Sequence, residues 1–235
     1  MPEITIAPVV RDRLALALDT DDLVDALRVA RDLEPWFGVA KVGLELFSAT
    51  GPEVVTAFVD RGWRVFLDLK LHDIPTTVRK AARVLGALGA SYVTVHAHGG
   101  VEMLRAGVEG LVIGAEQAGL EPPAAIAVTV LTSDDGAPPH ILGKRVASAV
   151  EAGCRGIVCS ASDVREAKQL APRLFAVVPG IRLSGTDAHD HARAATPDEA
   201  ILAGADLLVV GRAVTAAPDR VAAAIALAGA VGAVV

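Results

Sequence analysis

Eight short apolar runs, spread along the chain and rich in β-branched residues, constrain the fold more than any other feature. They are nearly continuous in apolar residues, which is typical of strands buried on both faces of a parallel sheet. Their average spacing of roughly 28 residues matches the share of one unit in an eightfold barrel of ~250 residues. The runs are residues 14–18, 39–42, 65–67, 92–95, 125–130, 156–158, 175–178 and 207–210.

Segments of helical period separate these runs. Residues 23–33 carry apolar side chains at i, i+3, i+4 and i+7 behind two N-cap candidates, Asp21 and Asp22. Thr196-Pro-Asp-Glu199 has the sequence of a capping box, with Pro at the first helical position. Strict alternation of strands and helices requires parallel strands joined by right-handed crossovers.

We therefore predict an α/β fold, a (β/α)8 TIM barrel that forms a single domain over residues 1–235. An open, doubly wound sheet is the alternative architecture. Its dinucleotide-binding fingerprint, G-x-G-x-x-G after the first strand, is missing here, because the first run ends in Ala17-Leu18-Asp19.

Charge balance and cysteine content narrow the class of protein. The 235 residues include 22 basic and 28 acidic side chains, a net charge of −6, which argues against a nucleic-acid binder. A hydrophobic fraction of 52% excludes disorder. Two cysteines do not make a disulfide scaffold, and the first residues lack the pattern of a signal peptide. We expect reduced thiols in a cytoplasmic protein with no membrane partner.

Polar residues stand where the predicted strands end. The chemistry of such barrels sits at the carboxyl ends of the strands, so these residues are expected to meet at one mouth. They are Asp19, Lys41, Asp68, Lys70, His96, His98, Thr132 and Arg212.

The stretch Asp68-Leu-Lys70-Leu-His72-Asp73 is the most informative in the chain. Side chains two apart on a strand share a face, so Asp68 and Lys70 point into the barrel while the leucines beside them point outward. Buried charges need partners, and Lys41 and Asp73 are available. One interpretation is a structural salt-bridge network. The other is an ammonium held protonated between carboxylates and presented as a proton donor to a developing carbanion.

Asp68-x-Lys70-x-x-Asp73-Ile-Pro resembles the signature of the orotidine 5'-phosphate decarboxylase family, which makes UMP from OMP in de novo pyrimidine synthesis. The resemblance covers nearly the whole chain. Further similar segments, in the family's order, are Leu16-Ala-Leu-Asp19, Lys41-Val-Gly43, Val93-Thr-Val-His96-Ala, Val128-Thr-Val-Leu-Thr132-Ser, Val158-Cys-Ser160, Pro179-Gly-Ile-Arg182 and Val209-Val-Gly211-Arg212.

The resemblance implies a role for each site residue. Lys70 would protonate C6 of the pyrimidine as carbon dioxide leaves, and Asp68 would lie near the substrate carboxylate. Lys41 would contact the ribose and order the charged array. The other implied ligands are Asp19 for the ribose, Thr132 for the base, and Arg182, Gly211 and Arg212 for the phosphate.

The resemblance also implies a homodimer and chemistry without a cofactor or a metal. Asp73, Ile74 and Thr77 would reach the active site of the neighbouring subunit. Decarboxylation leaves electron density on an sp² carbon with no adjacent electron sink, so the barrier must fall through charges arranged in advance.

Two other functions remain open. Related barrels that act on phosphosugars carry a similar Asp-x-Lys-x-x-Asp but use magnesium, with Glu where this chain has Lys41; the lysine removes a ligand and adds a positive charge. A phosphate-binding barrel without catalysis is the second alternative. Retention of Lys41, Asp68, Lys70 and Asp73 argues against it.

Three further features of the sequence have alternative interpretations. His191 falls nearest the place of a glutamine that bridges phosphate and base in related bacterial enzymes, although Arg193 or a water could replace that glutamine instead. His96 and His98 have no evident further metal ligand, so we expect them to be structural. Gly211-Arg212 and Pro179-Gly-Ile-Arg182 match the phosphate site common in barrels, or else are a turn glycine and surface arginines.

Overall fold

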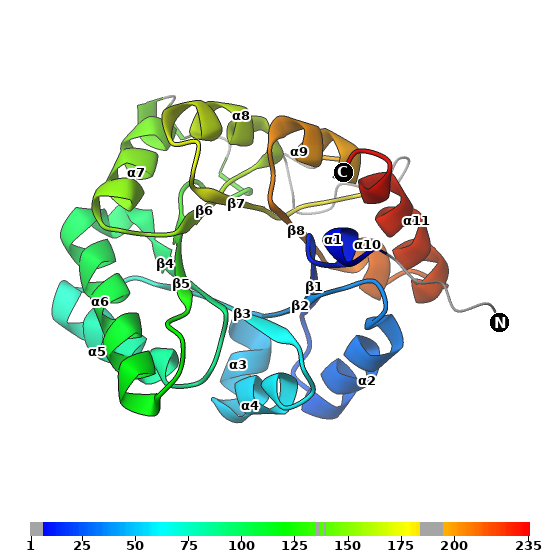
Figure 1. Ribbon diagram of the computed structural model, residues 1–235, viewed down its shortest axis with the longest axis horizontal. Helices are drawn as coiled ribbons and strands as arrows, with labels where there is room; N and C mark the ends of the chain where they lie inside the picture. The colour runs from blue at the N-terminus through cyan, green and yellow to red at the C-terminus, as the bar shows by residue number, and fades with distance from the viewer. Residues whose placement is uncertain (1–6, 135–136, 139, 184–194) are drawn as a thin grey trace.

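The computed structural model describes residues 7–134, 137–138, 140–183 and 195–235. Eight parallel strands close into a barrel in chain order, with β8 pairing with β1 (Figure 1). The predicted (β/α)8 barrel is confirmed and the open sheet is wrong, because the pairing of β8 with β1 leaves none of the eight strands at an edge. The strands are β1 Leu14–Leu18, β2 Val39–Val42, β3 Arg64–Leu71, β4 Tyr92–His96, β5 Ala124–Val128, β6 Gly156–Val158, β7 Phe175–Val178 and β8 Leu207–Val210.

Five of the eight strands match the predicted bounds, and three differ at their ends. β3 runs to Leu71 rather than residue 67, β4 includes His96, and β5 ends at Val128 rather than residue 130. The prediction for β3 stopped at the first charged side chain. Backbone pairing continues past Asp68, since Leu71 still pairs with Val95 of β4.

The helices form a ring outside the strands (Figure 1). Asp22 accepts hydrogen bonds from the backbone N–H groups of Val24 and Asp25, and Thr196 and Glu199 form the predicted capping box. The helices are α1 Pro8–Arg11, α2 Leu23–Leu33, α3 Leu44–Thr50, α4 Glu53–Val59, α5 Pro75–Gly86, α6 Gly100–Ala118, α7 His140–Glu151, α8 Ala161–Leu170, α9 Pro197–Ala203, α10 Arg212–Thr215 and α11 Arg220–Gly232, with a 3₁₀ turn, η1, at Ala97–Gly99. Within the described residues, none of these helices has the length and apolarity to cross a membrane.

The apolar core has two layers. The larger layer lies between strands and helices and is mostly aliphatic, while the smaller one fills the inside of the barrel. Aromatic rings close the inner layer, where Tyr92 stacks on Phe175 with ring centroids 5.6 Å apart and meets Phe66 edge-on. These side chains fill the inside of the barrel toward the amino ends of the strands. The cavity described below opens at the carboxyl ends.

Helices α5 and α6 approach each other closely through glycines. A Cβ on Gly114 would lie 1.9 Å from the carbonyl oxygen of Arg83, and one on Gly110 would lie 2.4 Å from that of Arg79. On the α5 side, a Cβ on Gly86 would lie 2.3 Å from the carbonyl oxygen of Leu111. Backbone therefore packs on backbone, and this contact fixes α5, the helix that follows Asp73 directly.

We expect Gly114→Ala to lower the free energy of unfolding by about 2 kcal/mol or more, because the added methyl can be accommodated only if the two helices move apart. Gly229→Ala on α11 is the matched control, since no heavy atom lies within 4 Å of the site of its Cβ. That substitution should be neutral or stabilise by up to about 1 kcal/mol through helix propensity. Urea unfolding of both variants tests this; equal stabilities would contradict the packing argument.

Candidate active site

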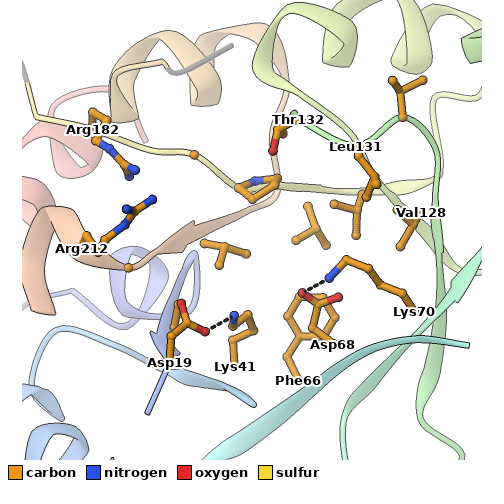
Figure 2. A pocket seen from close by; sticks show the side chains of 18 residues that line it. Asp19, Lys41, Phe66, Asp68, Lys70, Val128, Leu131, Thr132, Arg182 and Arg212 are labelled. Atoms are coloured by element: carbon orange, nitrogen blue, oxygen red, sulfur yellow. Dashed lines mark hydrogen bonds and ion pairs between the residues drawn. The ribbon is translucent and has the colours of Figure 1, made fainter. Parts of the chain in front are cut away.

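A cavity of about 260 Å³ opens at the carboxyl ends of the strands (Figure 2). It contains eight of the predicted site residues. They are Asp19, Lys41, Asp68, Lys70, Thr132, Arg182, Gly211 and Arg212. The rest of the lining is mostly small or aliphatic: Ala17, Phe66, Val128, Val130, Leu131, Val158, Val177, Pro179, Gly180 and Val209.

The lining follows from the two-residue period of the strands. Residues that face the inner core are followed two positions later by residues that face the cavity, as in Val39 and Lys41 of β2. Phe66 and Asp68 of β3 repeat this arrangement. The inward faces of β2 and β3 thus change from apolar to charged toward their carboxyl ends, which brings charges from distant parts of the sequence together.

Two ion pairs cross the floor of the cavity. Lys41 Nζ lies 2.8 Å from Asp19 Oδ1, and Lys70 Nζ lies 2.8 Å from Asp68 Oδ2. One partner of each pair is largely buried, Lys41 at 11% exposed and Asp68 at 17%, whereas Asp19 is 57% exposed and Lys70 32%. Both ammonium groups are therefore held in place before any ligand arrives.

These pairs differ from the expected network. Lys41 and Asp73 were predicted as partners of the Asp68–Lys70 pair, but Lys41 binds Asp19. The reason is register: Lys41 pairs with Ala17 across β1 and β2, which places it beside the residue that follows β1. The Asp73 carboxylate accepts a hydrogen bond from the backbone N–H of Ile74 instead.

Thr94 of β4 supplies the contact that the sequence analysis missed. Its side chain is fully buried, and its hydroxyl donates to Asp68 Oδ1 at 3.1 Å. The same hydroxyl accepts a 2.8 Å hydrogen bond from the backbone N–H of Lys70. The sequence did carry a signal, because Thr94 is a polar residue between two valines of β4, Val93 and Val95.

Lys70 reaches the cavity through an unusual backbone. Its φ is +51°, the only positive value for a non-glycine among the described residues. The pairing of β3 with β4 also shifts register between Leu67 and Leu71. A left-handed conformation costs a residue with a Cβ about 1–2 kcal/mol, and such strain persists where the surrounding contacts over-determine it. Here the Thr94 hydrogen bond holds the strained residue.

Two arginines stand at the opposite side of the cavity from Lys70. Figure 2 shows the guanidinium groups of Arg182 and Arg212 pointing toward each other across the space. Arg182 is 6% exposed, and its Nη1 donates to the carbonyl oxygen of Ile181 at 2.8 Å. Two cations that converge on one space favour a doubly charged anion between them.

The remaining predicted residues lie elsewhere. Asp73, Ile74 and Thr77 are exposed at the start of α5 and lie outside the cavity lining of the described chain. Ile74 is 66% exposed and is one of several large apolar side chains at the surface of the described chain. His191 falls outside the described residues, so its role stays a prediction.

Three histidines gather beside Lys70. The ring centroid of His72 lies 5.5 Å from those of His96 and His98, which are 6.3 Å from each other. Among the described residues, no group of three or more His, Cys, Asp or Glu side chains is arranged to hold a metal. His96 Nδ1 accepts a hydrogen bond from the backbone N–H of His98, so the ring proton belongs on Nε2.

The pKa of His96 is lowered from 6.5 to about 4, chiefly by burial of the ring. Neighbouring positive charge makes up the rest of this shift, from His72, Arg145, His98 and Lys70 in decreasing order. His96 is therefore neutral at physiological pH, which keeps additional positive charge away from the ammonium of Lys70.

A family model described as "Orotidine 5'-phosphate decarboxylase / HUMPS family" matches residues 12–227. The chain belongs to this family. It is 47% identical over 228 residues to the orotidine 5'-phosphate decarboxylase of Anaeromyxobacter sp. (strain K), covering 92% of this chain and 97% of that protein. The orotidine 5'-phosphate decarboxylase of Moorella thermoacetica is 42% identical over 230 residues, covering 93% and 91%.

Two solved structures agree with the fold. The orotidine 5'-phosphate decarboxylase of Lactobacillus acidophilus superposes with a TM-score of 0.79 at 32% identity, covering 94% of this chain and 99% of that one. An uncharacterized conserved protein from Geobacillus kaustophilus gives the same TM-score at 34% identity, covering 93% and 99%. The predicted family resemblance is thus confirmed.

The neutral state of His96 predicts a pH dependence of stability. Between pH 6.5 and about 4, His96 binds a proton in the unfolded chain but stays neutral in the folded protein. The contribution to stability is therefore complete above pH 6.5 and is lost as the pH falls through this window. His96→Asn keeps an acceptor for the His98 N–H but cannot titrate, so it should lose less stability on acidification.

Urea unfolding at about pH 7.5 and about pH 5 measures this difference. His140→Asn, at the exposed start of α7, serves as the matched control and should behave as the wild type does. An identical acid-induced loss in wild type and His96→Asn would contradict the assignment.

Proposed function

We propose that the chain catalyses the decarboxylation of OMP to UMP and carbon dioxide, as orotidine 5'-phosphate decarboxylase. The observation that carries the proposal is the Lys70 ammonium, paired with Asp68 on the cavity floor and opposite the converging guanidinium groups of Arg182 and Arg212. A proton donor and an anion site at two ends of one cavity fit a substrate with a reacting carboxylate at one end and a phosphate at the other.

In the proposed reaction, the bond between C6 and the carboxylate carbon breaks and its electron pair stays on C6. Lys70 Nζ gives a proton to that carbon, so carbon dioxide leaves and the lysine ends neutral. Asp68 pairs with the ammonium beforehand and faces the departing carboxylate. Because the two groups lie 2.8 Å apart, little rearrangement is needed as charge develops.

The other cavity residues bind the parts of OMP that do not react. Arg182, Arg212 and the Gly211 backbone bind the phosphate, and the Asp19–Lys41 pair binds ribose hydroxyls. Thr132 contacts the base from the β5 side of the cavity. Binding energy from these remote groups holds the reacting carbon against Lys70 and so contributes to the rate.

The active form is proposed to be a homodimer in which Asp73, Ile74 and Thr77 of one subunit enter the site of the other. Support comes from the exposure of all three residues at the start of α5 and of the large apolar side chain of Ile74 in particular. In a dimer with twofold symmetry each subunit both gives and receives this segment. The second carboxylate that the sequence analysis expected beside Lys70 then comes from the neighbour.

Lys41 separates this proposal from the magnesium-dependent alternative within the same family. Its ammonium is 2.8 Å from Asp19 and occupies the position where those barrels carry a glutamate. A cation there would repel Mg²⁺. Loss of OMP absorbance with purified protein, unchanged by EDTA, is the expected result, and absence of turnover by folded protein would overturn the proposal.

We expect Lys70→Ala to lower kcat for OMP by at least about 10²-fold, because the variant lacks the proposed proton donor. Binding of UMP should stay within about tenfold of wild type, since the phosphate ligands lie on other strands. Lys144→Ala, an exposed lysine on α7, is the control and should keep normal turnover. Near-normal turnover by Lys70→Ala would exclude Lys70 as the donor.

Subunit mixing tests the shared site. A mixed dimer of Asp73→Ala and Lys70→Ala subunits has one site without either lesion, so random exchange should restore activity to about a quarter of all sites. Each homodimer alone should be nearly inactive. If subunit exchange is confirmed by mass spectrometry and activity does not return, Asp73 acts within its own subunit.

A further inference from the structure

Arg145 of α7 connects two segments at the mouth of the barrel. Its Nη1 donates to the carbonyl oxygen of Thr129, and its Nη2 lies 3.1 Å from His98 Nδ1. Thr129 is a firm anchor, because it is fully buried and its hydroxyl donates to the carbonyl oxygen of Val158 at 2.7 Å. The guanidinium therefore holds His98 at a fixed position relative to the carboxyl end of β5.

The hydrogen bond between Arg145 and His98 can have only one direction. A guanidinium has donors only, so His98 Nδ1 must accept and its ring proton must lie on Nε2. The backbone N–H of the same residue donates to His96 Nδ1 at 3.2 Å. His98 is thus held at both its ring and its backbone, which fixes the plane of its imidazole.

The fixed imidazole meets the residue before Asp73. The rings of His98 and His72 are edge-to-face, at 82° with centroids 5.5 Å apart. His96 packs against His72 from a second direction, also at 5.5 Å. Residues 72–77 are otherwise exposed, so within the described chain these ring contacts and the helix contact of α5 with α6 hold the segment.

We propose that Arg145 is a positioning residue for the reaction: it orients His98, and through it His72, so that Asp73 is presented to the neighbouring subunit. The inference rests on the proposed function, since it requires Asp73 to act in the neighbouring site. Arg145 itself lies outside the lining of the cavity among the described residues, so it acts through this segment and not on the substrate.

The first test is a double-mutant cycle on kcat/KM for OMP. Arg145→Met should lower kcat/KM by about tenfold in the wild-type background and by less than about twofold in an Asp73→Asn background. In a Lys41→Ala background the full tenfold factor should persist. Lys144→Met, the adjacent exposed cation of α7, is the matched control and should keep wild-type kcat/KM.

The second test asks in which subunit Arg145 acts. In a mixed dimer of Arg145→Met and Lys70→Ala subunits, the site with intact Lys70 receives its Asp73 segment from the subunit with intact Arg145. Mixing should therefore raise the total activity of the two preparations about fivefold. If Arg145→Met instead damaged the active site of its own subunit, that site would stay impaired in the mixed dimer. Mixing would then leave the total activity unchanged.

Each outcome decides the inference. The inference would be overturned if Arg145→Met lowered kcat/KM equally with and without Asp73, or if it had no effect on kcat/KM. It would also be overturned if mixing the subunits did not raise the activity. If Asp73→Asn keeps full turnover, both the inference and the proposed role of Asp73 are overturned. If Asp73→Asn loses turnover but the effect of Arg145→Met on kcat/KM simply adds to that loss, the inference alone is overturned. If Arg145→Met does not fold, His98→Ala removes the same link from its other end and serves in both tests.

Discussion

Closure of eight parallel strands into a ring is the constraint on which the rest of this protein depends. Once β8 pairs with β1, the inward-facing residues of every strand have no direction to point except the barrel axis. The aromatic and aliphatic plug fills the lower part of that space. Inward positions above the plug must share one cavity, and that is where Asp19, Lys41, Asp68 and Lys70 meet.

Concentrating charge in such a cavity is costly unless the charges are paired. The chain pairs each ammonium of the cavity with one carboxylate, and two guanidinium groups converge at the far side. The site is therefore charged in advance for an anionic substrate, which is what a reaction without an electron sink requires. The left-handed backbone of Lys70, held by Thr94, is the local strain that accompanies this arrangement.

The outer ring of helices contributes more than cover for the sheet. Glycines let α6 hold the backbone of α5, and the histidine contacts reach the residue before Asp73 from η1 and β4. Arg145 adds a link from α7 to the same segment. Elements of the two units that follow β3 and α5 thus converge, directly or through His98, on the exposed stretch that is proposed to complete the neighbouring site.

The sequence by itself determined the barrel, most strand bounds, two helix caps and the eight predicted site residues that line the cavity. These depend on periods of two and 3.6 residues and on short motifs, which are local properties of the chain. Only the tertiary structure decided that Lys41 pairs with Asp19, that Thr94 supports both Asp68 and Lys70, and that Arg145 reaches His98. Those contacts depend on strand register, on a break in the β3–β4 ladder and on the packing of α7, and each of these is set by residues far apart in the sequence.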